Sequence, residues 1–262
     1  MCLISLIGCT NEVVQPEKTI NCTISLTNND TVYNNVLSTV SANITTSNTD
    51  VSKIEYFIDG VSKKTLFSKP YNLDLTLSDL KTGIHTITLN VTSTDNTSKS
   101  FTKDFFFKVN LGDIYQGGVV IKLSSNKING VIASETNLPG GLLGKFKYGA
   151  YNGDYQAYSL DDGLANTNKF DGKPDSYYAA IGCLGLVYNG YSDWYLPALN
   201  ELLLFENFLA KLNIPERSGY IYWSSTESTT DTKSAYSHGF GVLIGQPCDK
   251  QSYYLVRPVR RF

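Results

Sequence analysis

Three dense sequence blocks decide the fold of this chain: Gly190-Tyr191-Ser192-Asp193-Trp194-Tyr195-Leu196-Pro197, Tyr222-Trp223-Ser224-Ser225-Thr226-Glu227 and Val256-Arg257-Pro258-Val259-Arg260-Arg261-Phe262. Both tryptophans of the chain lie in these blocks. The stretch 237–255, between the second and third blocks, has no obvious pattern of its own. Distinct blocks around an irregular segment indicate a scaffold that presents a surface.

The composition favours a globular protein outside the cytoplasm. At 262 residues the chain is long enough for two domains. A charged fraction of 18% with abundant Tyr and Thr favours β structure and an extracytoplasmic setting. The net charge of −2 argues against a nucleic-acid partner, because no excess of positive charge is available for phosphates. Two histidines and scattered carboxylates form no metal-ligand cluster, so we expect no metal and no cofactor.

The N-terminal residues 1–19 are predicted to be the remnant of a lipoprotein signal and a tether. The apolar run Leu3 to Cys9 resembles a bacterial lipobox, which implies that Cys9 carries a lipid. No Lys or Arg precedes this run and it is short for a signal peptide, so an ordinary apolar N-terminus remains the alternative. No other segment approaches the roughly 20 apolar residues of a membrane span. The predicted location is therefore the bacterial cell surface, lipid-anchored in the outer membrane.

The five cysteines suggest neither a zinc site nor a redox motif, because none form a Cys-x-x-Cys pair. A disulfide between Cys183 and Cys248 and isolated buried thiols are both open alternatives.

Residues 20–110 are predicted to form an all-β sandwich. The segment Val51 to Ile58 alternates and ends at Asp59-Gly60, a strong hairpin signal. The segment Ile84 to Val91 also alternates, with Ile84, Ile87, Leu89 and Val91 expected on one face. The residues 54–60, Lys69-Pro70-Tyr71 and 80–87 resemble bacterial Ig-like domains of surface proteins. In that family a histidine at the place of His85 is structural, and the module is a spacer.

Residues 111–262 are predicted to form a mixed α+β domain. One helix is expected from Ser176 to Cys183 or Leu184. Another is expected from Pro197 to the stop at Asn213-Ile214-Pro215. In this second helix Ala198 stands where a hydroxyl residue would cap, three residues before Glu201, so half of the capping box is missing, at a cost of about 1 kcal/mol.

The whole of 112–262 resembles the C-terminal domain family of the Legionella collagen-like adhesin. That resemblance implies a C-type-lectin-like fold related to formylglycine-generating enzymes. It rests on the three blocks above and on the following segments: 112–120, 130–133, Gly163, 165–167, Ala179-Ala180 with Cys183, Glu201-Leu202 and Phe240.

Six residues of the blocks are predicted to be scaffold. Each indole N–H of Trp194 and Trp223 needs a partner. A closing strand can place Arg257 and Arg260 beside Asp193 or Glu227, where a bidentate pair would stabilise the fold. A ligand-binding role for the two arginines is the alternative.

The irregular segment supplies the predicted ligand-binding residues. Related lectin-fold proteins have such segments rewritten by diversity-generating retroelements, and this chain resembles a diversified copy. The composition of the segment does not distinguish a diversified copy from an undiversified one. The alternative is that 236–244 is a core strand, which would bury His238. Phe240 is itself predicted to lie in the core. The predicted ligand-binding set is Ser237, His238, Val242, Leu243, Gln246, Asp249, Gln251 and Tyr253.

The predicted function is that of an adhesin-like surface lipoprotein rather than an enzyme. Its slightly acidic charge favours a protein or a neutral glycan over a sulfated glycan as ligand. Two alternatives are a formylglycine-generating-enzyme-like catalyst, whose cysteine motif Cys183 and Cys248 do not match, and a phage receptor-binding protein. Neither signature of the calcium-dependent animal lectins occurs, so metal-free binding is expected. The sequence indicates neither the ligand nor the oligomeric state.

Overall fold

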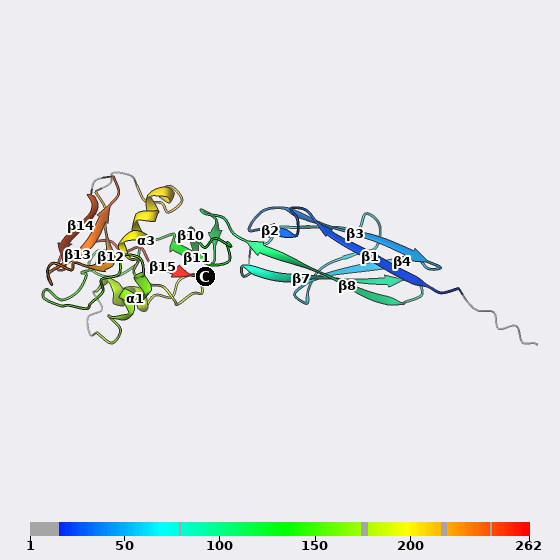
Figure 1. Cartoon of the computed structure of the whole chain (residues 1–262), viewed down its shortest axis with the longest axis horizontal. Coiled ribbons are helices and arrows are strands. Elements are labelled where there is room, and N and C mark those ends of the chain that lie inside the picture. The colour runs from blue at the N-terminus through cyan, green and yellow to red at the C-terminus, as the bar shows by residue number, and fades with distance from the viewer. Residues whose placement is uncertain (1–15, 79, 174–177, 216–218, 242) are drawn as a thin grey trace, which may run out of the picture. The chain divides into compact units, whose positions relative to one another are not determined.

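The computed structural model describes residues 16–78, 80–173, 178–215, 219–241 and 243–262. The described residues are mostly β, with 44% in strands and 9% in helices. It divides into two compact units, shown as ribbons in Figure 1. The first comprises the described residues of Met1–Val32, Leu37–Leu75 and Ile84–Phe106. The second comprises those of Tyr33–Val36, Thr76–Gly83 and Phe107–Phe262.

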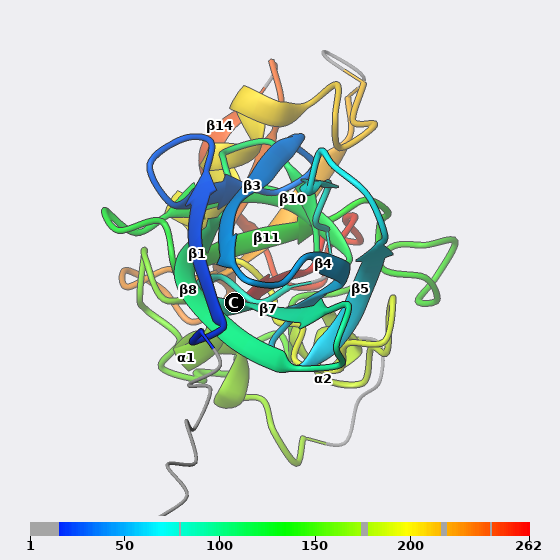
Figure 2. The same cartoon turned by 90° about the vertical axis from the view of Figure 1, so that its right-hand side faces the viewer.

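Two antiparallel sheets build the Ig-like part of the chain, as the end-on view in Figure 2 shows. One sheet has the order β1-β3-β6 and the other the order β2-β8-β7-β4-β5. Their bounds are β1 Thr19–Leu26, β2 Thr31–Tyr33, β3 Ser38–Ser47, β4 Val51–Ile58, β5 Val61–Leu66, β6 Asn72–Leu75, β7 Gly83–Ser93 and β8 Ser98–Lys108.

The predicted hairpin at Asp59-Gly60 is confirmed. Ile58 pairs with Val61, and both turn residues have positive φ, 48° and 78°, as a type I′ turn requires. In β7 the prediction was wrong for Ile84, which is 65% exposed, whereas Ile87, Leu89 and Val91 are buried. Side chains alternate with a period of two, so a residue three positions from Ile87 points to the opposite face.

The second unit contains two small sheets. One has the order β15-β11-β10-β9 and the other the order β12-β13-β14. Their bounds are β9 Ile114–Tyr115, β10 Gly118–Leu123, β11 Gly130–Ser134, β12 Ile221–Glu227, β13 Ser234–Gly239, β14 Leu243–Asp249 and β15 Val259–Arg261. Its helical elements are α1 Gly163–Asn168, α2 Ala179–Leu184, α3 Leu199–Leu203 and the 3₁₀ helix η1 Leu204–Phe208.

Both predicted helices are shorter than expected. Helix α2 starts after Tyr178, and the predicted cap Ser176 lies outside the described residues. The helix expected from Pro197 is α3 followed at once by η1. Side chains on the same apolar face bury equally well in a 3₁₀ turn, so the spacing of leucines did not distinguish the two.

A hydroxyl from another element completes the start of α3. Glu201 Oε2 accepts the backbone N–H of Ala198 at 3.0 Å, which is the half of the capping box that the sequence retains. The Leu199 N–H donates to Thr226 Oγ1 of β12 at 3.1 Å. One of the unpaired N–H groups of the first helical turn is therefore satisfied from across the fold, although not the one that a side chain at Ala198 would cap.

Two buried clusters form the core of this unit. One joins the β10–β11 sheet to α3 and η1 through residues such as Val119, Leu202 and Phe205. The other surrounds Trp223 with Tyr148 and Phe170, and its rings meet edge to face. Cys183 is buried in this cluster as a free thiol, and Cys248 is also free, so no disulfide joins them.

Candidate ligand-binding surface

The tryptophans of the sequence blocks are buried and hydrogen-bonded. Trp223 Nε1 donates to the carbonyl oxygen of Phe146 at 2.8 Å, and Trp194 Nε1 donates to that of Tyr191 at 3.1 Å. Burying an indole without a partner for its N–H would cost free energy, so these bonds fix the position of each ring. Both side chains thus act within the structure and not on its surface.

Arg260 forms the bidentate ion pair with Asp193. Nε donates to Oδ1 at 2.7 Å and Nη2 donates to Oδ2 at 3.0 Å. The guanidinium also stacks on Tyr191, 3.9 Å from the ring centroid. This planar, doubly bonded arrangement uses the geometry that distinguishes arginine from lysine.

Arg257 has a different environment. It is buried, and it donates to Asn137 Oδ1 and to the carbonyl oxygens of Ser134 and Leu212. Burial lowers the pKa of its guanidinium. The expectation that Arg257 lies beside Asp193 or Glu227 is corrected, because a buried arginine is here satisfied by oxygens that carry no full charge.

Glu227 pairs with Lys250, a residue that the sequence did not single out. Lys250 Nζ lies 2.5 Å from Glu227 Oε1, and each side chain is 1% exposed. Glu227 Oε2 also accepts the backbone N–H groups of Tyr155 and Ala157, and Lys250 donates to the carbonyl of Gly153. All these partners hold the turn after β14 against the core.

Two of the predicted ligand-binding residues are inaccessible. Ser237 and His238 of β13 are 0% exposed. Ser237 Oγ donates to Cys248 Sγ, and the His238 ring lies against Phe240, which is buried. The prediction that they contact a ligand is therefore corrected: Ser237 contacts Cys248, and His238 contacts Glu206 of η1 as well as Phe240.

His238 occupies a polar niche with one defined tautomer. The Gly245 N–H donates to Nδ1 at 3.3 Å, so Nδ1 carries no proton. Nε2 therefore bears the hydrogen and donates to Glu206 Oε1 at 3.1 Å. Burial lowers the pKa of His238, and Glu206 opposes this shift.

Strand β14 carries the accessible part of the predicted set. It is an edge strand, and the side chains of Gln246 and Asp249 are exposed. Leu243 begins β14, but its side chain lies outside the described residues, as does the whole of Val242. The surface proposed below therefore rests on β14 from Gly245 onward and on the turn after it.

Gln251 and Tyr253 are half-buried and share one lysine. Lys147 Nζ donates to Gln251 Oε1 at 2.8 Å and lies 5.4 Å from the centroid of the Tyr253 ring. Gln251 Nε2 donates to the carbonyl of Gly149 at 2.7 Å. These contacts hold both side chains in place before any ligand arrives.

A hollow of about 110 Å³ lies beside Tyr253. The exposed Tyr220 and the half-buried Tyr254 contribute to its wall. Sequence analysis missed Tyr220, Lys145 and Lys147, because they belong to segments far from β14 in the chain. We call the group Gln246, Asp249, Gln251, Tyr253, Lys147 and Tyr220 the β14 surface; Gln246 and Asp249 are three positions apart, so their side chains leave this edge strand on opposite faces.

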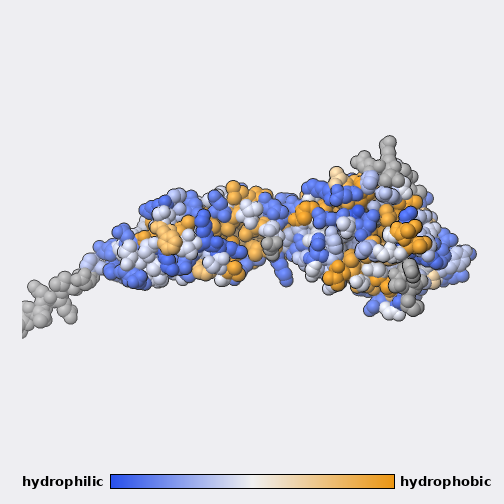
Figure 3. Space-filling view, turned by 180° about the vertical axis from the view of Figure 1, so that it is seen from behind, coloured by the Kyte–Doolittle hydropathy of each residue, from blue (hydrophilic) through white to orange (hydrophobic). Residues whose placement is uncertain are grey.

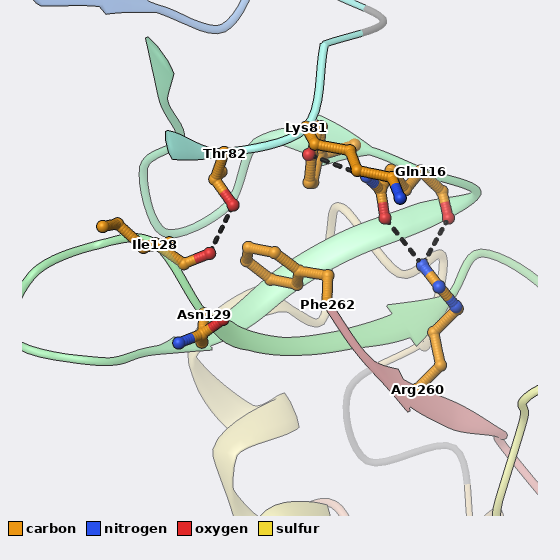
Figure 4. A pocket seen from close by; sticks show the side chains of 8 residues that line it. Lys81, Thr82, Gln116, Ile128, Asn129, Arg260 and Phe262 are labelled. Carbon is orange, nitrogen blue, oxygen red and sulfur yellow. Dashed lines mark hydrogen bonds between the residues drawn. The ribbon is translucent and has the colours of Figure 1, made fainter. Parts of the chain in front are cut away.

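A larger cavity, of about 280 Å³, lies elsewhere in the second unit (Figure 4). Its eight lining residues all belong to that unit, and the ring of Phe262 lies in the middle of the view. Its walls are Lys81, Thr82, Tyr115, Gln116, Ile128, Asn129, Arg260 and Phe262.

Hydrophilic and apolar residues are interspersed on the face drawn in Figure 3. Within the described ranges, no group of three or more His, Cys, Asp or Glu side chains is placed to hold a metal ion. No helix among the described residues has the length and apolar character needed to cross a membrane. The predicted lipidation site Cys9 lies outside the described residues.

Comparison with known proteins identifies the first part of the chain. Residues 20–89 match the family model of the bacterial Ig domain, which confirms the Ig-like prediction for this region. No curated protein matches the sequence.

Solved structures resemble the chain only weakly. The fibronectin(III)-like modules of Clostridium thermocellum CbhA are 18% identical over 35% of this chain and 98% of that chain, with a TM-score of 0.29. Bacteroides ovatus SGBP-B in complex with a mixed-linkage heptasaccharide is 12% identical over 44% of this chain and 31% of that chain, with a TM-score of 0.27. CopC from Methylosinus trichosporium OB3b is 16% identical over 36% and 100%, with a TM-score of 0.24. Such scores carry no argument about a ligand.

Proposed function

We propose that this protein is an adhesin-like surface protein that binds its ligand through the β14 surface. The observation that carries the proposal is a contrast in accessibility. Gln246 and Asp249 are exposed, whereas the adjoining Trp223, Glu227 and Lys250 are buried and hydrogen-bonded. Polar side chains and a tyrosine that stand on buried, hydrogen-bonded residues are suited to ligand recognition, because they lose little conformational entropy on binding.

The binding domain proposed is 111–262, with a C-type-lectin-like fold. Support comes from the sequence blocks, whose tryptophans and arginines pack inside this part of the chain. Residues 20–110 would then act as the spacer, as bacterial Ig domains do in other surface proteins. The membrane attachment proposed is a lipid on Cys9 in the outer membrane, for which the apolar run Leu3 to Cys9 is the support.

The ligand proposed is a protein or a neutral glycan. Lys147 and Asp249 bring opposite charges to the β14 surface, so it has no strong preference for a charged partner. Tyr253 and Tyr220 provide amphipathic rings that can pack on either kind of ligand.

The enzymatic alternative has little chemical support. A formylglycine-generating mechanism needs reactive cysteines, and burial raises the pKa of the Cys183 thiol far above neutrality. The thiolate is the nucleophilic form, so Cys183 is unreactive in this structure.

The β14 surface can be tested by a triple substitution, Gln246→Ala, Asp249→Ala and Tyr253→Ala. The probe is the labelled full chain, measured on a glycan array and on a panel of bacterial and host cells. We expect binding to fall at least about tenfold, the effect of losing about 1.4 kcal/mol. Substitutions at the exposed Gln246 and Asp249 change the free energy of unfolding by about 0.5 kcal/mol or less each. Tyr253 is half-buried and costs more, so thermal unfolding of the variant checks that it is folded in the binding measurements.

The matched control replaces three exposed residues of β5, Lys63→Ala, Lys64→Ala and Thr65→Ala. It should bind as the unaltered chain does. If both triple variants bind equally well, the β14 surface is not the ligand site.

Diversification of 237–255 is a separate proposal, and its test is the DNA next to the gene. A reverse transcriptase gene with an Asn-rich template repeat that matches 222–262 is expected there.

A further inference from the structure

We infer that the 280 Å³ cavity is a second ligand site, which takes a single neutral sugar residue. It shares no residue with the β14 surface, and it does not depend on the function proposed for that surface. Its volume lies just below the roughly 300 Å³ at which pockets for drug-sized molecules begin, so it admits one ring.

Two aromatic rings give the cavity a rigid apolar wall. Phe262 and Tyr115 meet edge to face, with centroids 5.2 Å apart. Gly130 makes room for the Phe262 ring: a Cβ there would lie 2.7 Å from Phe262 Cε1 and 2.2 Å from the carbonyl oxygen of Lys122. The face of a sugar ring carries C–H groups, which pack on such rings.

The charges around the cavity disfavour an anionic ligand. The guanidinium of Arg260 is neutralised by Asp193, and its Nη1 donates to Gln116 Oε1 at 3.0 Å (Figure 4). Arg260 thus holds Gln116 in place, and its guanidinium is not available to bind a carboxylate or phosphate through two parallel hydrogen bonds. Lys81, the other cation of the wall, is itself engaged in a contact. No carboxylate side chain lines the cavity, so a cation finds no partner either.

The polar groups of the wall match hydroxyls, which both donate and accept. The hydroxyl of Thr82 donates to the carbonyl of Ile128, which leaves its oxygen as an acceptor. Gln116 Nε2 donates one hydrogen to Tyr115 Oη at 2.7 Å and retains a second. Asn129, exposed at the rim, adds an amide with both kinds of group. Donors and acceptors beside aromatic rings are what a polyhydroxylated ring needs.

The experiment uses the full chain and saturation-transfer NMR. The probes are the methyl glycosides of glucose, galactose, mannose and N-acetylglucosamine, with methyl glucuronide as the anionic comparison. At least one neutral glycoside should receive saturation, and more strongly than the glucuronide. Affinity should fall at least tenfold in Phe262→Leu and in Asn129→Ala. The Asn129 side chain is exposed, so this second variant keeps the test valid if Phe262→Leu fails to fold.

The β5 triple variant described above serves as the matched control and should retain the sugar signal. The inference is overturned if no neutral glycoside binds, if the glucuronide binds best, or if neither cavity variant weakens binding. Loss of the signal in the β14 variant alone would also overturn it, while supporting the β14 surface as the glycan site. Failure of the β14 test on cells and arrays leaves the cavity result unaffected, so the two proposals fail separately.

Discussion

At the scale of single residues, the buried charged pair Lys250 and Glu227 is the main addition to the sequence blocks. Burying two charges is costly, and the cost is offset here by a short ion pair and by backbone partners on both sides. The two residues are 23 positions apart, and nothing in the local sequence links them. The pair therefore belongs to the tertiary structure.

Removing one partner of this pair should destabilise the second unit strongly. Lys250→Met leaves Glu227 as a buried charge, and we expect the free energy of unfolding to fall by about 3–5 kcal/mol. Urea denaturation of the full chain measures the change. The control is Lys173→Met at an exposed position, expected within about 0.5 kcal/mol of the unaltered chain. The double variant Lys250→Met with Glu227→Gln should recover part of the loss; a loss below about 1 kcal/mol for Lys250→Met would contradict this account.

His238 should make stability depend on pH. Burial holds its folded-state pKa below the ordinary histidine value of 6.5, so the unfolded chain takes up a proton at a higher pH than the folded chain does. Stability is therefore fully present above about pH 6.5 and decreases as the pH falls through the window between the two pKa values. Protonated Nδ1 would also face the Gly245 N–H, which removes one hydrogen bond.

The check is to compare His238→Gln with the unaltered chain by urea denaturation at about pH 7.5 and about pH 5.5. A glutamine keeps an acceptor for Gly245 and a donor for Glu206 but does not titrate in this range. The unaltered chain should lose more stability on acidification than the variant. All other ionisable groups are common to both proteins, so their contributions cancel in the comparison; equal pH dependence would refute the role of His238.

At the scale of elements, the start of α3 shows how a defect in the local sequence is corrected from elsewhere. The sequence correctly indicated that the Ala198 side chain cannot accept a hydrogen bond at the start of the helix. It also indicated that Glu201 keeps its half of the capping box. It gave no sign that Thr226, on a strand of the second block, lies close enough to accept the Leu199 N–H. The predicted cost of the missing cap is therefore reduced by tertiary packing.

Thr226→Val tests this replacement, since valine keeps the shape and removes the hydroxyl. The Leu199 N–H then loses its acceptor and the carbonyl of Ser159 loses a donor. We expect a loss of about 1–2 kcal/mol in thermal or urea unfolding. Thr232→Val, at an exposed threonine, is the comparison and should be nearly neutral; equal effects of the two changes would argue against the cap.

At the scale of the whole molecule, the ligand recognition proposed above requires no metal ion. The described residues contain no carboxylate or histidine group arranged for a metal ion, and the chain has a net charge of only −2. Both proposals assign binding to aromatic and polar side chains, at the β14 surface and at the cavity.

Ligand binding should accordingly be independent of divalent metals. Adding a chelator such as EDTA to the cell and array measurements is expected to leave binding unchanged, and adding calcium should not increase it. Binding abolished by the chelator and restored by calcium would refute metal-free recognition.

Much of the fold could be predicted because its signals are local. The alternation of β4 and the Asp59-Gly60 turn specify a hairpin by themselves, since side-chain period and turn geometry act over a few residues. The lengths of the helices could not be predicted as well, because α-helical and 3₁₀ turns bury the same leucines. Within the candidate site, Gln246 and Asp249 are exposed, whereas Ser237 and His238 are not, because their burial depends on residues distant in sequence, such as Cys248 and Glu206.

The sequence by itself determined the bacterial Ig-like part, the mostly β character, and the residues that need buried partners, above all the two tryptophans and Arg260. Only the tertiary structure decided who those partners are: Phe146 for Trp223, Asp193 for Arg260 and Lys250 for Glu227. It also placed Tyr220 and Lys147 beside Tyr253, and Phe262 against Tyr115. The physical reason is range. Propensities and periodicity act between neighbours in the chain, whereas ion pairs, hydrogen bonds to distant carbonyls and cavities arise only when segments far apart in sequence pack together.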